Sequence, residues 1–371
     1  MSSTEKLTLP AKYNCICVLG PTAVGKTPLA VALAKEFDGE VISVDSRQVY
    51  KYLDIGSGKD LCEYTINGEP IPYHLIDVTE LPTEYSVFDF QAEVYKVFPE
   101  ILSRKKVPVF CGGTGMYLQS VVQGLDLIEV PCNEELRTEL GGKSEAELTE
   151  ILLKLKNGKL HNKTDTEDRH RLLRAIEIEV FQQNNQEIPK TNRMPLRPDI
   201  RPLIIGTTFP RDILRSNIKR RLGARVDEGL IPEVEKLNKM GIGYDRLERL
   251  GLEYRFVSEY LEGKIPTKEE LISKLYIAIG QFAKRQETWF RRMEKQGVKI
   301  NWLPFDGKEE ERQPSGNLCG CTQVGLRPVL HSCTSGKDME PHQPRDHTGR
   351  TEVLRSRLHL QERTIPRLRN H

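Results

Sequence analysis

The sequence lacks any apolar run long enough to cross a membrane, and its first twelve residues lack the apolar core of a secretory signal. Its eight cysteines follow no disulfide-framework spacing. We therefore expect a protein of the reducing cytoplasm that has no membrane partner. We also expect it to act as a monomer. The 371 residues are 38% hydrophobic and 29% charged, which is typical of a soluble globular chain with room for two domains, or for one domain with an insertion.

An excess of charge of one sign is also absent. The chain has 55 Lys and Arg against 53 Asp and Glu, a net charge of +2. Residues 307–371 hold 11 of these basic residues and 8 of the acidic ones, which leaves 44 against 45 in residues 1–306. A protein that binds any polyanion would be more basic, so a contact with nucleic acid has to come from local clusters of Lys and Arg.

Aromatic residues are missing from residues 307–371, which nevertheless contain five of the eight histidines. Such a segment cannot bury enough apolar surface to order itself, so we predict that it is a disordered tail. Cys319, Cys321 and Cys333 could suggest a zinc module together with the histidines, but their spacing matches no common zinc finger.

The clearest feature that is present is a phosphate-loop motif. Residues 20–27 match the pattern G-x-x-x-x-G-K-[ST], between an apolar run typical of a buried strand, residues 15–19, and a helical pattern. In such a loop, backbone N–H groups and the helix dipole bind phosphate oxygens, and the Thr hydroxyl binds Mg²⁺. We expect Thr27 to be this metal ligand. The predicted diphosphate-binding residues are Gly20, Thr22, Ala23, Val24, Gly25, Lys26 and Thr27.

Two more predicted strands end in polar residues. Residues 40–44 lead to Asp45, and residues 107–111 lead to a Gly-Gly-Thr loop at Thr114 that allows a ligand to approach the backbone closely. In open α/β sheets, ligands bind at the carboxyl ends of the strands. Position alone leaves two roles open for Asp45, an acid that faces the phosphate loop or the cap of the turn that follows.

The predicted fold class is α/β, a parallel phosphate-loop NTPase-like sheet formed by residues 10–125 and 198–306. Residues 126–197 have a helical, strongly charged pattern without an apolar strand, so we expect a helical insertion. Cations cluster near its end at residues 169–174, where His170 is a candidate catalytic base or a solvated or stacking side chain.

A long helix is predicted at residues 268–296. Its apolar face is expected at Leu271, Leu275, Phe282, Trp289 and Met293. Its other face is rich in Lys and Arg, which fits either a solvated surface or contact with a phosphate backbone.

Eight motifs occur in an order and at spacings that resemble tRNA dimethylallyltransferases. They are GPTAVGKT, VDSRQVY, DIGSGKD, HLID, CGGTGMY, RLLRAIE, LEYRFVSEYLEGK and FAKRQETWFRR. The resemblance covers roughly residues 15–303, and the tail has no counterpart in the short bacterial form of the family. The sequence departs from the family pattern at His170, where many members have Gln, at Glu253, and at Gly280, where an Arg is common.

The resemblance implies transfer of a dimethylallyl group from its diphosphate to the N6 amine of the adenosine 3′ to the anticodon in tRNA, with Mg²⁺ as cofactor. Dimethylallyl diphosphate and the anticodon stem-loop are the implied partners. An adenine amine is a poor nucleophile, so a base is needed, and Asp45 is the candidate. Lys26 and Arg171 would meet the charge of the leaving diphosphate, and Thr114 would line the channel for the extruded base.

Together with the cation clusters, the resemblance also predicts a tRNA-binding set. Its members are Asp45, Ser46, Arg47, Gln48, His170, Arg171, Arg174, Arg221, Arg255, Lys284, Arg285, Gln286 and Arg291.

Three alternatives remain. An adenylate prenyltransferase of cytokinin synthesis would perform the same chemistry on a free nucleotide and would need no insertion. A small-molecule kinase or ATPase would use the same loop for a nucleoside triphosphate. A noncatalytic RNA-binding protein is disfavoured because Lys26 and Asp45 are both present.

Overall fold

The computed structural model describes residues 7–158, 169–185 and 192–303. The predicted tail and its candidate zinc ligands lie outside these residues. None of the described helices is long and apolar enough to span a bilayer.

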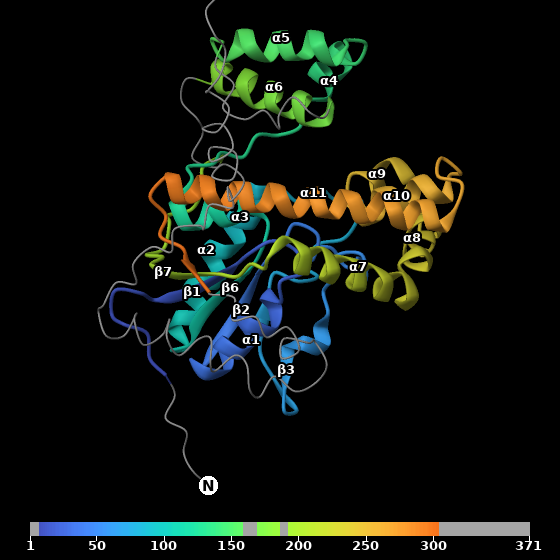
Figure 1. Cartoon of the computed structure of the whole chain (residues 1–371). Coiled ribbons are helices and arrows are strands. Elements are labelled where there is room, and N and C mark those ends of the chain that lie inside the picture. Colours follow the sequence, from blue (N-terminus) through green and yellow to red (C-terminus); the bar gives the residue numbers. More distant parts are fainter. Residues whose placement is uncertain (1–6, 159–168, 186–191, 304–371) are drawn as a thin grey trace, which may run out of the picture. The chain divides into compact units, whose positions relative to one another are not determined.

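Six parallel strands form the central sheet, in the order β5-β2-β6-β1-β7-β8 (Figure 1). Their bounds are β1 Cys15–Leu19, β2 Gly39–Val44, β5 Tyr73–His74, β6 Val107–Gly112, β7 Pro202–Gly206 and β8 Asn301–Trp302. β1 and β2 are buried along their whole length, which is typical of a parallel sheet covered on both faces. Cys15, Cys17 and Cys111, which lie in β1 and β6, are free and buried.

The strand register brings four chain segments to one edge of the sheet. Leu19 pairs with Gly112 on one side and with Gly206 on the other, and Val44 also pairs with Gly112. β1, β2, β6 and β7 therefore end at the same level. The phosphate loop follows β1 and so leaves from the middle of this edge.

Helices pack on both faces of the sheet and beside it. α1 (Lys26–Glu36) packs against β2 and β6. Cys15, Cys17 and Leu19 face a hydrophobic cluster that contains residues of α2 (Val87–Ser103), α3 (Gly115–Gln119) and the end of α11 (Lys268–Lys295). A second cluster joins the first half of α11 to α7 (Arg211–Glu228), α8 (Leu230–Lys239), α9 (Tyr244–Glu248) and α10 (Leu252–Leu261).

The region predicted as an insertion contains three helices, α4 (Glu134–Leu140), α5 (Glu145–Leu155) and α6 (Arg169–Asn184). They have a small core of their own, formed by Leu140, Leu148, Leu152, Leu172 and Ile176. A capping box between Ser144 and Glu147 starts α5. The chain enters and leaves this bundle beside an isolated bridge between Ile128 and Arg193. The remaining elements are short: the 3₁₀ helix Leu61–Tyr64, the π-helix Ser120–Gly124, and a hairpin of β3 (Thr65–Ile66) and β4 (Glu69–Pro70).

The predicted apolar face of α11 was partly wrong. Leu271, Leu275 and Met293 are buried as predicted, and Trp289 is partly buried against the cluster that contains α2 and α3, but Phe282 is 38% exposed. The other buried positions are Ile279, Ala283, Gln286 and Phe290. A seven-residue spacing drifts around a helix that has 3.6 residues per turn, so Phe282 turns away from the buried face. The sequence did not reveal this buried face completely, because Gln286 is polar and Ala283 is small, so neither residue marks a core position.

Candidate active site

A cavity of about 1670 Å³ lies at the carboxyl ends of the strands. Residues from the phosphate loop, the ends of β2 and β6, and helices α6, α7, α10 and α11 line it. Most of the predicted site residues are brought together here: Thr22, Ala23, Val24, Gly25, Lys26, Thr27, Asp45, Ser46, Arg47, Gln48, Thr114, His170, Arg171, Arg174, Arg221, Arg255, Arg285 and Gln286. Gly20, Lys284 and Arg291 do not line the cavity.

The phosphate loop has the backbone that its motif predicts. Ala23 and Gly25 adopt left-handed conformations with φ of 61° and 72°, and Gly25 is the N-cap of α1. No acidic residue lies in the first turn of α1, so the positive end of the helix dipole is not offset there. A β-carbon on Gly20 would collide with the backbone oxygen of Thr207, so only glycine fits where β1 and β7 meet.

Two cations lie at this end of the cavity. Lys26 Nζ donates to Pro21 O at 2.6 Å, and Arg221 Nη1 donates to Thr22 Oγ1 at 3.0 Å. Burial lowers the pKa of Lys26 to about 8, and Arg221 also favours the neutral lysine. Burial and the neighbouring Arg225 likewise lower the pKa of Arg221. An anion bound here would relieve this repulsion, so the site favours a phosphate ligand.

Gln286 connects α11 to two loops of the cavity. Its Oε1 accepts the N–H of Thr22 at 2.8 Å, and its Nε2 donates to Gly113 O at 2.9 Å. The side-chain amide therefore fixes the phosphate loop against the loop after β6. Sequence reasoning missed this role; the predicted contact of Gln286 with tRNA stays a prediction.

Asp45 combines the two roles that its position left open. Among the described residues its hydrogen bonds all go to Oδ1, from the N–H of Arg47 at 2.8 Å and of Gln48 at 3.4 Å. The carboxylate thus caps the turn after β2 and is oriented by it, while it also lines the cavity. Next to it, the N–H of Ser46 donates to Thr114 Oγ1 at 3.3 Å and joins the ends of β2 and β6.

The loop of residues 54–60 is built by contacts that the sequence did not reveal. Glu233 of α8 accepts three backbone N–H groups, from Asp54, Ile55 and Gly56, at 3.0, 2.7 and 3.1 Å. Lys59 is buried, and its Nζ lies 2.6 Å from Asp54 Oδ1 and 2.5 Å from Asp77 Oδ1. These contacts make the loop a fixed wall of the cavity.

This wall holds the arginines of α7. Arg225 donates to Ile55 O and, at 3.0 Å, to Asp60 Oδ2. Gly58 has a φ of 69°, and a β-carbon there would collide with the guanidinium groups of Arg221 and Arg225. The glycine in the DIGSGKD motif therefore leaves the space that these two side chains occupy.

Glu63 and Glu253 are cavity residues absent from the predicted site. Burial raises the pKa of Glu63 to about 7, with Asp60 as the next cause. Burial also raises the pKa of Glu253, against the opposing effect of Arg225 and Arg221. A carboxyl group that takes up a proton repels a bound diphosphate less than a carboxylate does. Only Glu253 had a signal in the sequence, as a departure from the family pattern.

Comparison with known proteins supports one family. Residues 48–293 match the family model described as IPP transferase, and residues 13–67 match that of isopentenyl transferase. The chain is 55% identical over 300 residues to tRNA dimethylallyltransferase 2 of Treponema denticola, which covers 80% of this chain and 98% of that protein. It is 49% identical over 292 residues to the tRNA dimethylallyltransferase of Treponema pallidum strain Nichols, covering 78% and 91%.

The chain belongs to the tRNA dimethylallyltransferase family. It is also similar to the solved structure of the tRNA isopentenylpyrophosphate transferase from Bacillus halodurans, with 29% identity, a TM-score of 0.57, and coverage of 87% of this chain and 98% of that one. A eukaryotic dimethylallyltransferase solved acting on tRNA has the same fold, with 21% identity, a TM-score of 0.63, and coverage of 89% and 81%. The family, fold class and enzyme class predicted from the sequence are confirmed.

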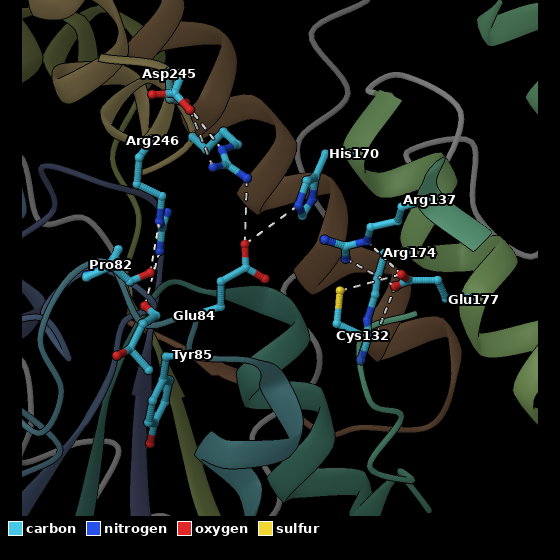
Figure 2. Close-up of polar contacts among 12 residues, drawn as sticks. Pro82, Glu84, Tyr85, Cys132, Arg137, His170, Arg174, Glu177, Asp245 and Arg246 are labelled. Atoms are coloured by element: carbon cyan, nitrogen blue, oxygen red, sulfur yellow. Dashed lines mark hydrogen bonds and ion pairs between the residues drawn. The ribbon is translucent and has the colours of Figure 1, made fainter. Parts of the chain in front are cut away.

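In this tRNA dimethylallyltransferase family member, the insertion contributes Arg174 to the cavity lining. Arg174 donates to the buried carboxylate of Glu177 at 3.0 Å (Figure 2) and to Val130 O at 2.5 Å. Burial acts to raise the pKa of Glu177, but hydrogen bonds from Arg137 and Arg174 lower it overall. Arg174 is thus held by the insertion itself, and its predicted contact with tRNA stays a prediction.

Proposed function

We propose that this protein transfers a dimethylallyl group from dimethylallyl diphosphate to N6 of the adenosine 3′ to the anticodon in tRNA and releases diphosphate. The observation that carries the proposal is that Lys26, Arg221 and Asp45 line one cavity. Two cations at one end suit a diphosphate, and a carboxylate nearby suits a base. Relatives that share 49% and 55% of the matched residues are named tRNA dimethylallyltransferases.

In this proposal, the phosphate loop holds the leaving group. The N–H groups of residues 23–27, Lys26 and Arg221 bind the diphosphate oxygens and stabilise the negative charge that develops as the carbon–oxygen bond breaks. Because the chain itself holds Arg221 through Thr22 before any ligand binds, little reorganisation is needed.

Asp45 acts as the base. The adenine nitrogen forms a bond to the prenyl carbon, the electron pair of the breaking bond leaves with diphosphate, and the proton of the amine passes to the carboxylate. The two backbone N–H groups at Oδ1 fix the direction of the carboxylate. Thr114, at the end of β6, lies against Ser46 and would line the path of the base.

Thr27 would hold Mg²⁺. The described residues contain no group of three or more His, Cys, Asp or Glu side chains that could bind a metal ion. A Mg²⁺ site made of one hydroxyl, substrate phosphate oxygens and water fits this arrangement. When bound, Mg²⁺ would neutralise charge on the diphosphate.

The acceptor is proposed to be the anticodon stem-loop, bound by the predicted tRNA-binding residues. The support lies in the helical insertion, which adds His170, Arg171 and Arg174 to the cavity and would serve no purpose for a free nucleotide. We further propose that the protein acts as a monomer in the cytoplasm.

One experiment tests the acceptor. Labelled dimethylallyl diphosphate is offered in parallel with unmodified tRNA, an anticodon stem-loop and AMP. We expect label in both RNAs and none in AMP. Label in AMP but not in the stem-loop would favour an adenylate prenyltransferase, and ATP hydrolysis without a prenyl product would favour a kinase or ATPase.

A further inference from the structure

At the rim of the cavity, one carboxylate contacts an arginine and a histidine from distant parts of the chain. Glu84 Oε1, in the loop before α2, lies 3.6 Å from Nε2 of His170 at the start of α6. The same oxygen lies 3.6 Å from Nη1 of Arg249, just after α9. Figure 2 shows the Glu84 side chain directed toward His170. All three residues line the cavity.

These contacts are too long and too exposed to contribute much to the stability of the fold. The side chains of Glu84, Arg249 and His170 are 59%, 38% and 37% exposed. By contrast, the buried Glu177 binds Arg137 at 2.6 Å. Exposed ion pairs contribute little to folding, so stability does not explain why Arg249 and His170 converge on one oxygen.

The surroundings of this point are rich in arginine. Arg171, Arg174, Arg246 and Arg255 also line the cavity. Arg246 lies over the ring of Tyr50 and donates to Thr83 O at 3.2 Å, next to Glu84 in the same loop. Arg249 is also near Asp245, one helical turn away, with 4.0 Å between Nη2 and Oδ2. Arg174 and Arg255 pair with Glu177 and Glu259 at 3.0 Å each, whereas Arg246 donates to uncharged oxygens of the described residues. Arg246 and Arg249 therefore supply positive charge that suits the backbone of an RNA.

We propose that His170 and Arg249 form a subsite for one backbone phosphate of the tRNA, and that Glu84 occupies this subsite until RNA binds. The inference rests on the proposed function. A phosphodiester carries one negative charge, as the carboxylate does, so the exchange preserves the local charge balance. The exposed Glu84 side chain can turn into water when it is displaced.

Occupation by Glu84 has a consequence for affinity. Any RNA that seats a phosphate at this point must displace the carboxylate from Arg249 and His170. The cost is the same for every RNA that uses the subsite, so Glu84 lowers the affinity for all of them and leaves the ratio of their affinities unchanged.

The test measures the affinity of the full chain for an unmodified anticodon stem-loop. Glu84→Gln keeps the shape and removes the charge, so we expect the dissociation constant to fall about two- to fivefold. A stem-loop that lacks the acceptor adenosine should show the same fold decrease in its dissociation constant, because it displaces Glu84 in the same way. Arg249→Ala should weaken binding by a similar factor and lower the slope of log affinity against log salt by about one. In the Arg249→Ala background, Glu84→Gln should have less effect.

Glu80→Gln is the matched control, because Glu80 lies in the same loop, pairs with Lys51 at 2.7 Å and does not line the cavity. It should leave RNA binding unchanged, and all variants should bind dimethylallyl diphosphate as the wild type does. An unchanged or weaker affinity in Glu84→Gln, with an unchanged melting temperature, would overturn the subsite. Transfer of label to the stem-loop by the wild type tests the proposed function separately, so a failure of the subsite alone can be recognised.

Discussion

The two ends of the cavity hold their cations in different ways. At the phosphate loop, Lys26 and Arg221 donate to neighbouring oxygens at 2.6 and 3.0 Å, and burial lowers the pKa of both. At the rim, Arg249 and His170 lie farther from their partner, at 3.6 Å from Glu84, although the Arg249 side chain is no more exposed than that of Arg221, at 38% each. A diphosphate is small, and its subsite can be complete before it binds. An RNA loop is large, and its contacts form one by one. We therefore expect single substitutions to cost much more at the closed end than at the rim.

The largest effect is expected for Asp45→Asn. The amide keeps the shape of the side chain but cannot take up the proton, so the single-turnover rate of prenyl transfer should fall by about 10²–10⁴. Binding of tRNA and of dimethylallyl diphosphate, measured by titration, should change only a few-fold. A near-normal rate would mean that Asp45 only caps the turn after β2 and that another residue is the base.

The second-largest effect is expected for Lys26→Met. A hydrogen bond between charged groups is lost, so affinity for dimethylallyl diphosphate should fall about 10- to 150-fold. Lys35→Met, on the same helix and outside the cavity, is the control. If both variants bound the diphosphate equally well, the phosphate loop would not hold the leaving group.

Lys26 also makes the stability of the ligand-free protein depend on pH. Its pKa of about 8 in the folded state is below the value of about 10.4 in an unfolded chain. Below pH 8 the lysine is charged in both states, and its burial costs stability; this cost disappears as the pH rises from 8 to 10. Lys26→Met should therefore melt no lower than the wild type at pH 7, and any advantage should shrink toward pH 10. A lower melting temperature at pH 7 would contradict this.

Gln286→Ala should change both the free energy of unfolding and the KM for dimethylallyl diphosphate. It leaves the N–H of Thr22 and the oxygen of Gly113 without their partner, at a cost of about 1–3 kcal/mol in the free energy of unfolding. Urea denaturation measures this cost, and the KM for dimethylallyl diphosphate should rise because the phosphate loop is less well held. Gln281→Ala, an exposed position on the same helix, should change neither quantity.

The smallest effects should occur on α11 at the rim. Arg285 lines the cavity and lies over the ring of Phe282 at 5.9 Å, whereas Arg291 is exposed and lies outside the cavity. Arg285→Ala should weaken tRNA binding about two- to fivefold, and Arg291→Ala should weaken it less. Filter binding at several salt concentrations measures both. Equal losses would show that the RNA also covers the side of α11 that faces away from the cavity.

The parts of the fold that could be predicted from the sequence are those whose structure depends on residues within the same segment. β1 is a continuous apolar run, and the phosphate loop carries its own glycines, so neither depends on distant contacts. The buried face of α11 was misjudged because Ala283 and Gln286 are buried only through tertiary packing. The support of the 54–60 loop could not be predicted, because Glu233 is about 177 residues away from the N–H groups that it accepts. A polar contact between residues far apart in the sequence produces no periodic pattern from which it could be predicted.

The strand order β6-β1-β7 also determines when the site can form during synthesis. Domains fold as their residues leave the ribosome, beginning at the N-terminus. The phosphate loop is among the first segments to emerge, but β7, which flanks β1, is made about 180 residues later, and Gln286, which holds Thr22, later still. A growing chain therefore carries the complete phosphate-loop motif through most of its synthesis without a finished diphosphate subsite. The proposed diphosphate subsite is complete only when α11 has been made, almost at the end of the described fold.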